Sequence, residues 1–442
     1  MYWQDWFARP VEVRGVGCVD DIVGKLKYEA EPSEQANDDG RFMGAFAGYR
    51  NLKRRIAGLA KRGIMMPFFQ PRDGVSTSVI RWQGRGLINY SGYNYLGLSG
   101  HPEVSAAAKA AIDKYGTSAS ASRIVSGQIG LHGDLEKRIA KFIGTQDAIV
   151  FVSGYLTNVT VISHLLSRVD GVIYDDAAHN SIMTGARLSG AKMITFPYGD
   201  WKGLEANLSQ NRSEFRRGLL VGEGVYSMDG MVYDLKRAVE LKRKHDLLLM
   251  IDEAHSLGTL GATGRGICEH TGIPSSSVDV HMGTLSKTLA GCGGYIAGDR
   301  DLIEYLRYLA PGFIFSVGLS PPDTGAAMAA LDILEREPQR TQELRQRTHF
   351  FRQLARQYGL PMGGEMDAPV ASLVIGNGNT CMMVSQRLLE AGIHVQPIVH
   401  PAVAVDGARL RFFITIDHTE AQFRATMPAI AKELEAIGQL VG

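Results

Sequence analysis

An unusually placed lysine is the first feature of this sequence that could do chemistry. Lys287 stands in MGTLSKTLAGCGGYIAG, residues 282–298, after an apolar stretch and before a glycine-rich one. Most lysines lie on solvated surfaces. A primary amine that works covalently on amino acids needs an electron sink, and pyridoxal phosphate is the usual one. Asp252, which ends the apolar run LLLMID, could pair with the cofactor's protonated pyridine nitrogen, because its charge needs a cation there.

Other short apolar runs are also followed by polar or ionisable residues. These residues are Gly154 and Tyr155 after DAIVFV, His179 after GVIY, Ser227 after GLLVGE, His255 after LLLMID, and Thr284 and Ser286 beside Lys287. Ligands of open α/β sheets gather beyond the carboxyl ends of the strands, so we expect these side chains to meet in one crevice. Backbone N–H groups at a helix start, together with hydroxyl groups, would suit the cofactor's phosphate.

Each residue also has a purely structural interpretation. A single S-x-K-T run is usually a surface turn, and Asp252 and His179 could each cap a helix. His255 could be a core histidine with its hydrogen bonds satisfied. The coincidence of all four features at the ends of separate apolar runs favours the chemical interpretation.

The elements that must position these residues form an alternating pattern from about residue 100. Apolar runs that suit strands covered on both faces alternate with helical stretches. The runs are DAIVFV, GVIY, KMITFP, GLLVGE, LLLMID, VDVHMG and GYIAG. Helices are expected in HPEVSAAAKAAIDKYG and LHGDLEKRIAKFIG. The pattern predicts an α/β domain with a mainly parallel sheet.

We expect three parts along the chain. Residues 1–75 form an N-terminal extension, with a polar linker at 28–41 and a basic amphipathic helix in YRNLKRRIAGLAKRG. Residues 76–325 form the large domain that binds the cofactor. Residues 326–442 form a smaller α+β domain, with a long charged helical stretch before the strands ASLVIG and ARLRFFIT.

Composition excludes several classes of protein. The 442 residues contain 47 Lys and Arg against 46 Asp and Glu, which provides no overall electrostatic reason for binding nucleic acid. No apolar run approaches the length of a membrane span. The four cysteines are scattered, which favours free thiols in a reducing compartment. The start, MYWQDWFARPVEV, does not have the pattern of a secretory signal, so a cytoplasmic protein is expected.

Many longer stretches match one family in the family's order. They are NYLGLSGHP, GTSASASRIVSG, FVSGY, HNSI, EGVYSMDG, MIDEAHSLGTLGATGRG, GTLSK, FIFSVGLSPP and ARLRFFITIDHT. In these stretches the chain resembles the α-oxoamine synthases, which include 8-amino-7-oxononanoate synthase, 5-aminolevulinate synthase, 2-amino-3-ketobutyrate ligase and serine palmitoyltransferase. The sequences of these stretches are most similar to those of synthase domains associated with polyketide assembly and of serine palmitoyltransferase.

The resemblance implies a homodimeric, fold-type-I enzyme with pyridoxal phosphate at the subunit interface. Such an enzyme joins an amino acid to an acyl thioester with loss of carbon dioxide. The resemblance also implies roles around the cofactor. Lys287 would be the Schiff-base lysine, Asp252 would lie at the pyridine nitrogen, and His179 would stack on the ring. His255 and Ser227 would be hydrogen-bond partners around the phenolic oxygen and the substrate. The phosphate would be bound by Gly154, Tyr155 and Thr284, and by Ser316 from the other subunit.

For the substrate, the resemblance implies that Arg411 binds the carboxylate bidentately. Asn94, in NYLGLSGHP, is a second candidate for substrate binding. Several relatives have R-P-P where this chain has Val399-His400-Pro401, so a second carboxylate-facing arginine is missing. Relatives that use only glycine often have threonine where Ser122 stands. The smaller side chain favours alanine or serine as the amino acid.

Three questions stay open at the level of the sequence. The acyl donor could be a coenzyme A ester, or a thioester on an acyl carrier protein, because the segment around 53–62 is basic and carrier proteins are acidic. Another fold-type-I enzyme with the same cofactor, such as an aminotransferase, is the alternative function. A cofactor-free module that binds carriers is the alternative from another class.

Overall fold

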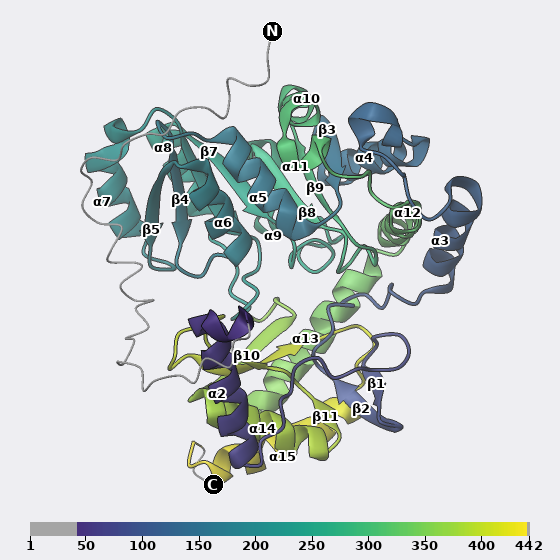
Figure 1. Ribbon diagram of the computed structural model, residues 1–442, viewed down its shortest axis with the longest axis vertical. Coiled ribbons are helices and arrows are strands. Elements are labelled where there is room, and N and C mark those ends of the chain that lie inside the picture. Colours follow the sequence, from purple (N-terminus) through teal and green to yellow (C-terminus); the bar gives the residue numbers. More distant parts are fainter. Residues whose placement is uncertain (1–41, 440–442) are drawn as a thin grey trace. The chain divides into compact units, whose positions relative to one another are not determined.

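The computed structural model describes residues 42–439, so the linker predicted at 28–41 lies outside the described residues (Figure 1). The chain divides into two compact units, Met1–Gly63 and Ile64–Gly442. In the first unit, the described residues form a short 3₁₀ helix, η2 (Phe42–Ala45), and helix α2 (Ala47–Lys61). The helix predicted in YRNLKRRIAGLAKRG is therefore confirmed.

A seven-stranded sheet dominates the second unit, with the strand order β3-β9-β8-β7-β6-β4-β5. The strands are β3 (Asp147–Phe151), β4 (Gly171–Asp175), β5 (Lys192–Phe196), β6 (Gly218–Glu223), β7 (Leu247–Asp252), β8 (Val280–Thr284) and β9 (Gly294–Gly298). Only β9 runs antiparallel to its neighbours. The predicted α/β class, with a mainly parallel sheet, is confirmed. Each strand overlaps the apolar run that predicted it, and β4 and β8 extend one residue beyond the end of their runs.

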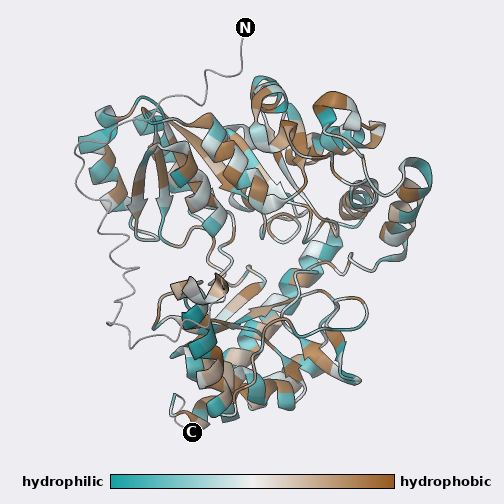
Figure 2. Ribbon diagram, in the orientation of Figure 1, coloured by the Kyte–Doolittle hydropathy of each residue, from teal (hydrophilic) through white to brown (hydrophobic). Residues whose placement is uncertain are grey.

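Helices cover both faces of this sheet. Alternate strand residues point to opposite sides, and because both sets are apolar, each face needs a layer of helices to bury it. On one face, Leu219 and Val221 of β6 pack with helices α5 (Gly154–Leu165), α6 (Asn180–Ser189), α10 (Arg300–Leu309) and α11 (Pro311–Ile314). On the other face, Leu220 packs with α7 (Trp201–Asn211), α8 (Leu235–His245) and α9 (Ile267–Thr271). Figure 2 shows how apolar residues concentrate on the strands between these layers.

The edge of the sheet at β3 and β9 is covered by a separate group of helices. They are α3 (Pro102–Tyr115), α4 (Gly130–Ile143) and α12 (Pro321–Arg336). Three short helical turns connect other elements of the second unit: η3 (Arg123–Gly127) lies between α3 and α4, η4 (Arg212–Glu214) between α7 and β6, and η5 (Ser275–Ser277) between α9 and β8. No helix in the described part of the chain is long and apolar enough to cross a membrane.

Two small sheets and three helices form the rest of the second unit, mostly from the C-terminal third of the chain and with two strands from before residue 90. One sheet joins β10 (Val370–Gly376), β13 (Ala408–Phe413) and β12 (Pro397–Ile398), and the other joins β1 (Val79–Trp82), β2 (Arg85–Asn89) and β11 (Ile393–His394). The helices are α13 (Gln339–Gln357), α14 (Gly378–Glu390) and α15 (Glu420–Ala436). The long charged stretch is split between α12 and α13 at Pro338, because proline cannot donate the backbone hydrogen bond of a continuing helix. The domain boundary predicted after residue 325 falls inside α12, so the division at that residue stays a prediction.

Strand β7 offers a test of the packing that supports the site. Leu249 is fully buried, whereas the neighbouring Leu248 is 39% exposed. We expect Leu249→Ala to lower the free energy of unfolding by about 2–5 kcal/mol, because it leaves a cavity in the central sheet. Leu248→Ala, the matched control, should cost roughly 1 kcal/mol or less. Urea denaturation of both variants measures the difference, and equal costs would contradict the described strand orientation.

Candidate active site

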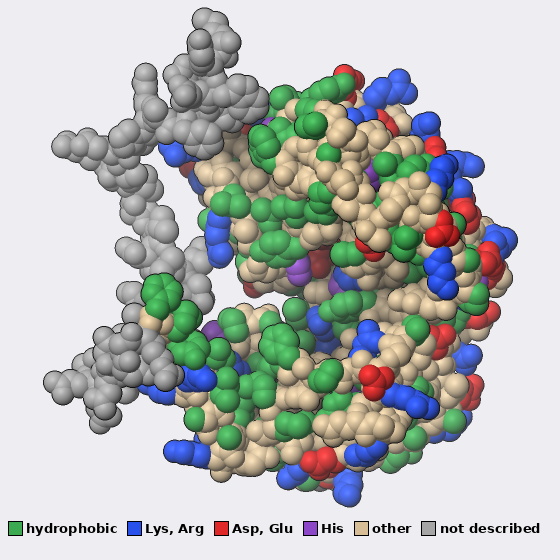
Figure 3. Space-filling model, turned by 45° about the vertical axis from the view of Figure 1, so that its right-hand side comes forward, with side chains coloured by type: hydrophobic (Ala, Val, Ile, Leu, Met, Phe, Trp, Pro, Cys, Tyr) green, Lys and Arg blue, Asp and Glu red, His purple; other side chains and the backbone are tan. Residues whose placement is uncertain are grey.

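Five parallel strands, β3, β4, β6, β7 and β8, end at the same edge of the large sheet. The loops that follow them carry most of the residues singled out in the sequence. In the space-filling view, a hollow lies in the surface, and histidine, acidic and basic side chains gather at it (Figure 3). The structure therefore brings together chemical groups that are far apart in the chain.

Asp252, at the end of β7, is only 4% exposed. Its Oδ2 accepts a hydrogen bond from Asn158 Nδ2 at 2.7 Å, and its Oδ1 accepts one from the Ala254 N–H at 2.9 Å. Among residues 42–439, no basic side chain forms an ion pair with this carboxylate. A buried carboxylate without a cation is costly, so the site has a place for a cationic ligand atom.

Lys287 follows the adjacent strand β8 and is partly buried. Its Nζ lies 5.6 Å from the centroid of the Tyr93 ring. Burial lowers the pKa of Lys287 to about 8, although the charges of Asp252 and Glu223 act in the opposite direction. About one tenth of this amine is therefore uncharged at pH 7, and the uncharged form is the one that acts as a nucleophile or base.

A chain of hydrogen bonds connects Asp252 to His179. Asn158 Nδ2 also donates to Ser181 Oγ at 2.9 Å, and Ser181 Oγ lies 2.7 Å from His179 Nδ1. The same His179 Nδ1 accepts a hydrogen bond from the Ser181 N–H, so His179 caps helix α6 as well. Burial lowers the pKa of His179, which favours the neutral imidazole. The capping interpretation and the chemical interpretation of His179 are thus compatible.

Glu223 holds the backbone of His179 in place. Its Oε1 accepts the His179 N–H at 2.6 Å, and Glu223 pairs with Asp252 in the register of β6 and β7. Burial, followed by the nearby Asp252 charge, raises the pKa of Glu223 well above its ordinary value. The raised pKa favours the protonated form of Glu223, which can still accept the His179 N–H through its carbonyl oxygen.

His255 lies in the loop after β7 and is 6% exposed. Its Nδ1 lies 2.7 Å from the hydroxyl of Tyr95, and its ring stacks on Phe413. Burial lowers the pKa of His255 well below its ordinary value and raises the pKa of Tyr95 well above its own. The Tyr95 hydroxyl therefore donates a hydrogen bond to Nδ1, and the neutral His255 has its own N–H at Nε2.

The first turn of α5 forms a cradle for an anion. Gly154 and Tyr155 are its first two residues, and their N–H groups have no acceptor within the helix. A Cβ on Gly154 would lie 2.8 Å from Thr284 Oγ1, so only glycine allows this close approach. Thr284 Oγ1 lies 2.7 Å from Ser286 Oγ. The Tyr155 hydroxyl donates to Asn180 Oδ1 at 2.9 Å.

Arg411, on β13, reaches the same region from the C-terminal part of the chain. Its Nη1 donates to the backbone carbonyl of Ser227 at 3.0 Å, and its guanidinium lies 4.7 Å from the Phe413 ring centroid. Its buried Nε has no hydrogen-bond partner within the described chain. Ser227 thus contacts Arg411 through its carbonyl, and the guanidinium retains donors for a ligand.

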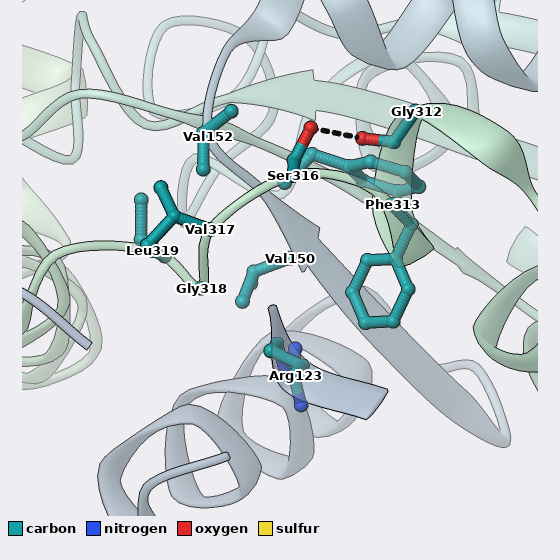
Figure 4. Close-up of a pocket in the computed structure, with 10 residues that line it drawn as sticks. Arg123, Val150, Val152, Gly312, Phe313, Ser316, Val317, Gly318 and Leu319 are labelled. Carbon is teal, nitrogen blue, oxygen red and sulfur yellow. Dashed lines mark hydrogen bonds between the residues drawn. The ribbon is translucent and has the colours of Figure 1, made fainter. Parts of the chain in front are cut away.

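Two predicted site residues lie apart from this group. Ser316 Oγ donates to the carbonyl of Gly312 in its own loop, beside a small pocket near Arg123 (Figure 4). The amide of Asn94 is engaged at both ends, with the Ser76 carbonyl and the Ser99 N–H. The expected roles of Ser316 and Asn94 therefore stay predictions.

Sequence reasoning missed several residues of the site: Tyr93, Tyr95, Asn158, Ser181 and Glu223. Asn158 lies one helical turn after Gly154, so its spacing in α5 was an available signal. Glu223 ends an apolar run as Asp252 does, and the same criterion would have selected it. Tyr93 and Tyr95 follow no strand of the large sheet, and only the tertiary structure places them.

Comparisons with known proteins identify the family of this chain. The model of the aminotransferase class I and II family matches residues 85–430. A putative 8-amino-7-oxononanoate synthase of Nostoc punctiforme is 37% identical over 361 residues, which cover 82% of this chain and 91% of the relative. A serine palmitoyltransferase of Bacteroides thetaiotaomicron is 34% identical over 374 residues, which cover 85% of this chain and 94% of the relative.

The fold is also shared with solved structures. A serine palmitoyltransferase with its pyridoxal phosphate internal aldimine has a TM-score of 0.84 and 29% identity, and the match covers 89% of this chain and 99% of that one. The chain belongs to the α-oxoamine synthase family. The predicted resemblance, the fold type I and the dependence on pyridoxal phosphate are confirmed. As a member of this family, the chain is an acyltransferase, as predicted.

The residues present in this α-oxoamine synthase fit pyridoxal phosphate. The buried Asp252 carboxylate lacks a basic partner among the described side chains and suits the cationic pyridine nitrogen. The cradle at Gly154 and Thr284 suits the phosphate, and the neutral His179 suits the face of the ring. Lys287 provides an amine with a lowered pKa for the aldehyde carbon.

Capture of the cofactor should depend on the pKa of Lys287. We expect the rate at which the cofactor-free enzyme takes up pyridoxal phosphate to rise about tenfold per pH unit below pH 8 and to level off above it, because only the unprotonated amine reacts. The visible absorbance that develops on mixing measures this rate, and Lys287→Ala is the control without absorbance. A midpoint near the ordinary lysine value of 10.5 would contradict the prediction.

Proposed function

We propose that this enzyme condenses a small amino acid with an acyl thioester and releases carbon dioxide, a free thiol and an α-amino ketone. The observation that carries the proposal is the pairing of a buried, uncompensated carboxylate with an amine of lowered pKa at the ends of adjacent strands. These groups are Asp252 on β7 and Lys287 after β8. Bound pyridoxal phosphate would act as an electron sink for the α-carbon of the amino acid.

Lys287 would move the proton in this reaction. With a pKa of about 8, its Nζ can accept the α-proton of the amino acid at neutral pH and release it again. The charge on Asp252 favours a protonated pyridine nitrogen, and the Asn158 amide orients the carboxylate for this contact. Glu223 supports the arrangement by holding the His179 backbone.

Arg411 and His255 would orient the two substrates. The Nε of Arg411 has no partner among the described residues, and its guanidinium can bind a carboxylate through two parallel hydrogen bonds. The Nε2–H of His255 would donate to the carbonyl oxygen of the thioester, where negative charge develops during attack. Tyr95 keeps this donor in the required tautomer.

We also propose that the enzyme is a homodimer that prefers alanine or serine to glycine. Exposed apolar side chains gather where the loop at Ser122 bridges Val317: Val125 is 78% exposed and Phe315 is 72% exposed. A second copy of the chain could bury this patch. Ser316 lies in the same loop, which supports a contact from this loop to the partner's cofactor. The small Ser122 side chain would leave room for a β-carbon.

Release of free thiol tests the proposed reaction. We expect the purified enzyme to release thiol from an acyl-coenzyme A donor, with higher rates for alanine or serine than for glycine. Lys287→Ala should lower kcat by roughly a hundredfold or more, because the general base is lost. The exposed Lys109→Ala variant should retain full activity. Exchange between amino and keto acids without thiol release would instead indicate an aminotransferase.

We also propose that an acyl carrier protein, and not coenzyme A, carries the acyl thioester to this enzyme in the cell. Between residues 42 and 72 the chain has seven Lys or Arg and no Asp or Glu. On α2, Lys53 and Arg54 are exposed. An acidic carrier would be attracted to this segment, chiefly through its rate of association.

Charge reversal on α2 tests the carrier hypothesis. We expect Lys53→Glu with Arg54→Glu to raise KM for a carrier-bound donor by roughly fivefold, since exposed ion pairs are individually weak. KM for the matching coenzyme A donor should be unchanged. Lys432→Glu, at an exposed lysine on α15, is the matched control. Equal effects of the α2 reversal on both donors would reject the hypothesis.

A further inference from the structure

A cavity of about 450 Å³ opens beside Arg411. Its volume lies within the range of about 300–1,000 Å³ that is typical of small-molecule sites. Tyr93 and Phe413 belong to its wall, and these rings also lie next to Lys287 Nζ and the Arg411 guanidinium. The cavity therefore borders the proposed active site and shares Arg411 with it.

The wall of this cavity is mainly apolar. Its apolar members are Phe68, Phe69, Tyr93, Pro397, Ile398 and Phe413. Arg411 is the only charged residue among those that line it. A ligand portion that fills this space must be largely apolar and uncharged, because the single guanidinium is already assigned to the carboxylate of the amino acid.

Phe69 is held in an unfavourable position at this cavity. Its side chain is fully exposed, and its backbone has a φ of 61°. A bulky residue rarely adopts the left-handed region, and such a conformation persists only when the surrounding structure imposes it. The turn is fixed at its base, where Gln396 Nε2 donates to the Pro67 carbonyl at 3.1 Å. Solvent exposure of an aromatic ring at the wall of a cavity suggests that a ligand covers it.

We propose that this cavity holds the aliphatic acyl chain of the thioester donor and that Phe68 and Phe69 select donors by chain length. The inference rests on the proposed function, which places the thioester carbon next to Lys287. The other substrate, a small amino acid, is too small for this volume. The missing arginine at Val399-His400-Pro401 agrees with an acyl chain that has no second carboxylate.

The expected effect follows from the burial of methylene groups. Each methylene that packs on the rings should raise kcat/KM by about fourfold until the cavity is filled. Phe68 and Phe69 lie before residues 85–430, which match the family model, so the proposed selectivity depends on the segment that precedes β1. Donors too short to reach the two rings should be indifferent to them.

A series of saturated acyl-coenzyme A donors tests the proposal with the full-length, cofactor-loaded enzyme. Thiol release is measured with butanoyl, octanoyl, dodecanoyl and hexadecanoyl donors. We expect Phe68→Ala and Phe69→Ala to lower kcat/KM by about tenfold for the long donors and to leave the butanoyl value unchanged. Phe69→Leu should retain most of the selectivity. Phe42→Ala, at an exposed phenylalanine that does not line the cavity, is the matched control.

Two further measurements separate this inference from folding and from the proposed reaction. Phe69→Gly removes the ring at a position where glycine is accepted, so its melting temperature should not fall while selectivity for long donors is lost. Binding of dodecanoyl-coenzyme A, measured calorimetrically, should weaken in Phe69→Ala even without turnover. A wild-type enzyme that releases no thiol would reject the proposed reaction alone. Equal effects on all chain lengths, or unchanged dodecanoyl binding, would overturn the role of the two phenylalanines.

Discussion

A negative charge buried at the end of a central strand is the feature on which the site depends. Asp252 accepts hydrogen bonds from Asn158 and Ala254, but no basic side chain among the described residues forms an ion pair with it. The large sheet makes this tolerable only if a cation completes the site. Burial and the nearby Asp252 charge raise the pKa of Glu223, its neighbour in register, which holds a backbone N–H.

The site also depends on two parts of the second unit meeting. The large sheet provides the lysine, the aspartate and the anion cradle, whereas β13 provides Arg411. The arginine is tied to the loop after β6 by its bond to the Ser227 carbonyl, and the Arg409–Asp229 ion pair joins the same two elements. The guanidinium is thereby fixed on the side where an amino acid and an acyl chain can both approach Lys287.

Much of the fold and part of the site could be predicted from local sequence. The strands of the large sheet are short apolar runs, and DAIVFV, GVIY and LLLMID end where β3, β4 and β7 end to within a residue. Residues directly after such runs, including Asp252 and Lys287, could be selected because parallel strands end at one edge. Asn158 and Tyr95 could not be found in this way, since they reach the site from within a helix and from a distant turn.

The sequence by itself determined the order of strands and helices along the chain, the family and the cofactor, because these depend on local periodicity and on motifs at strand ends. Only the tertiary structure decided which hydrogen bonds tune the groups. It paired Tyr95 with His255, connected Asp252 to His179 through Asn158 and Ser181, and set Phe68 and Phe69 at the cavity beside Arg411. These contacts join residues distant in the chain, and burial, which shifts the pKa of Lys287 and His255, is a property of the folded packing alone.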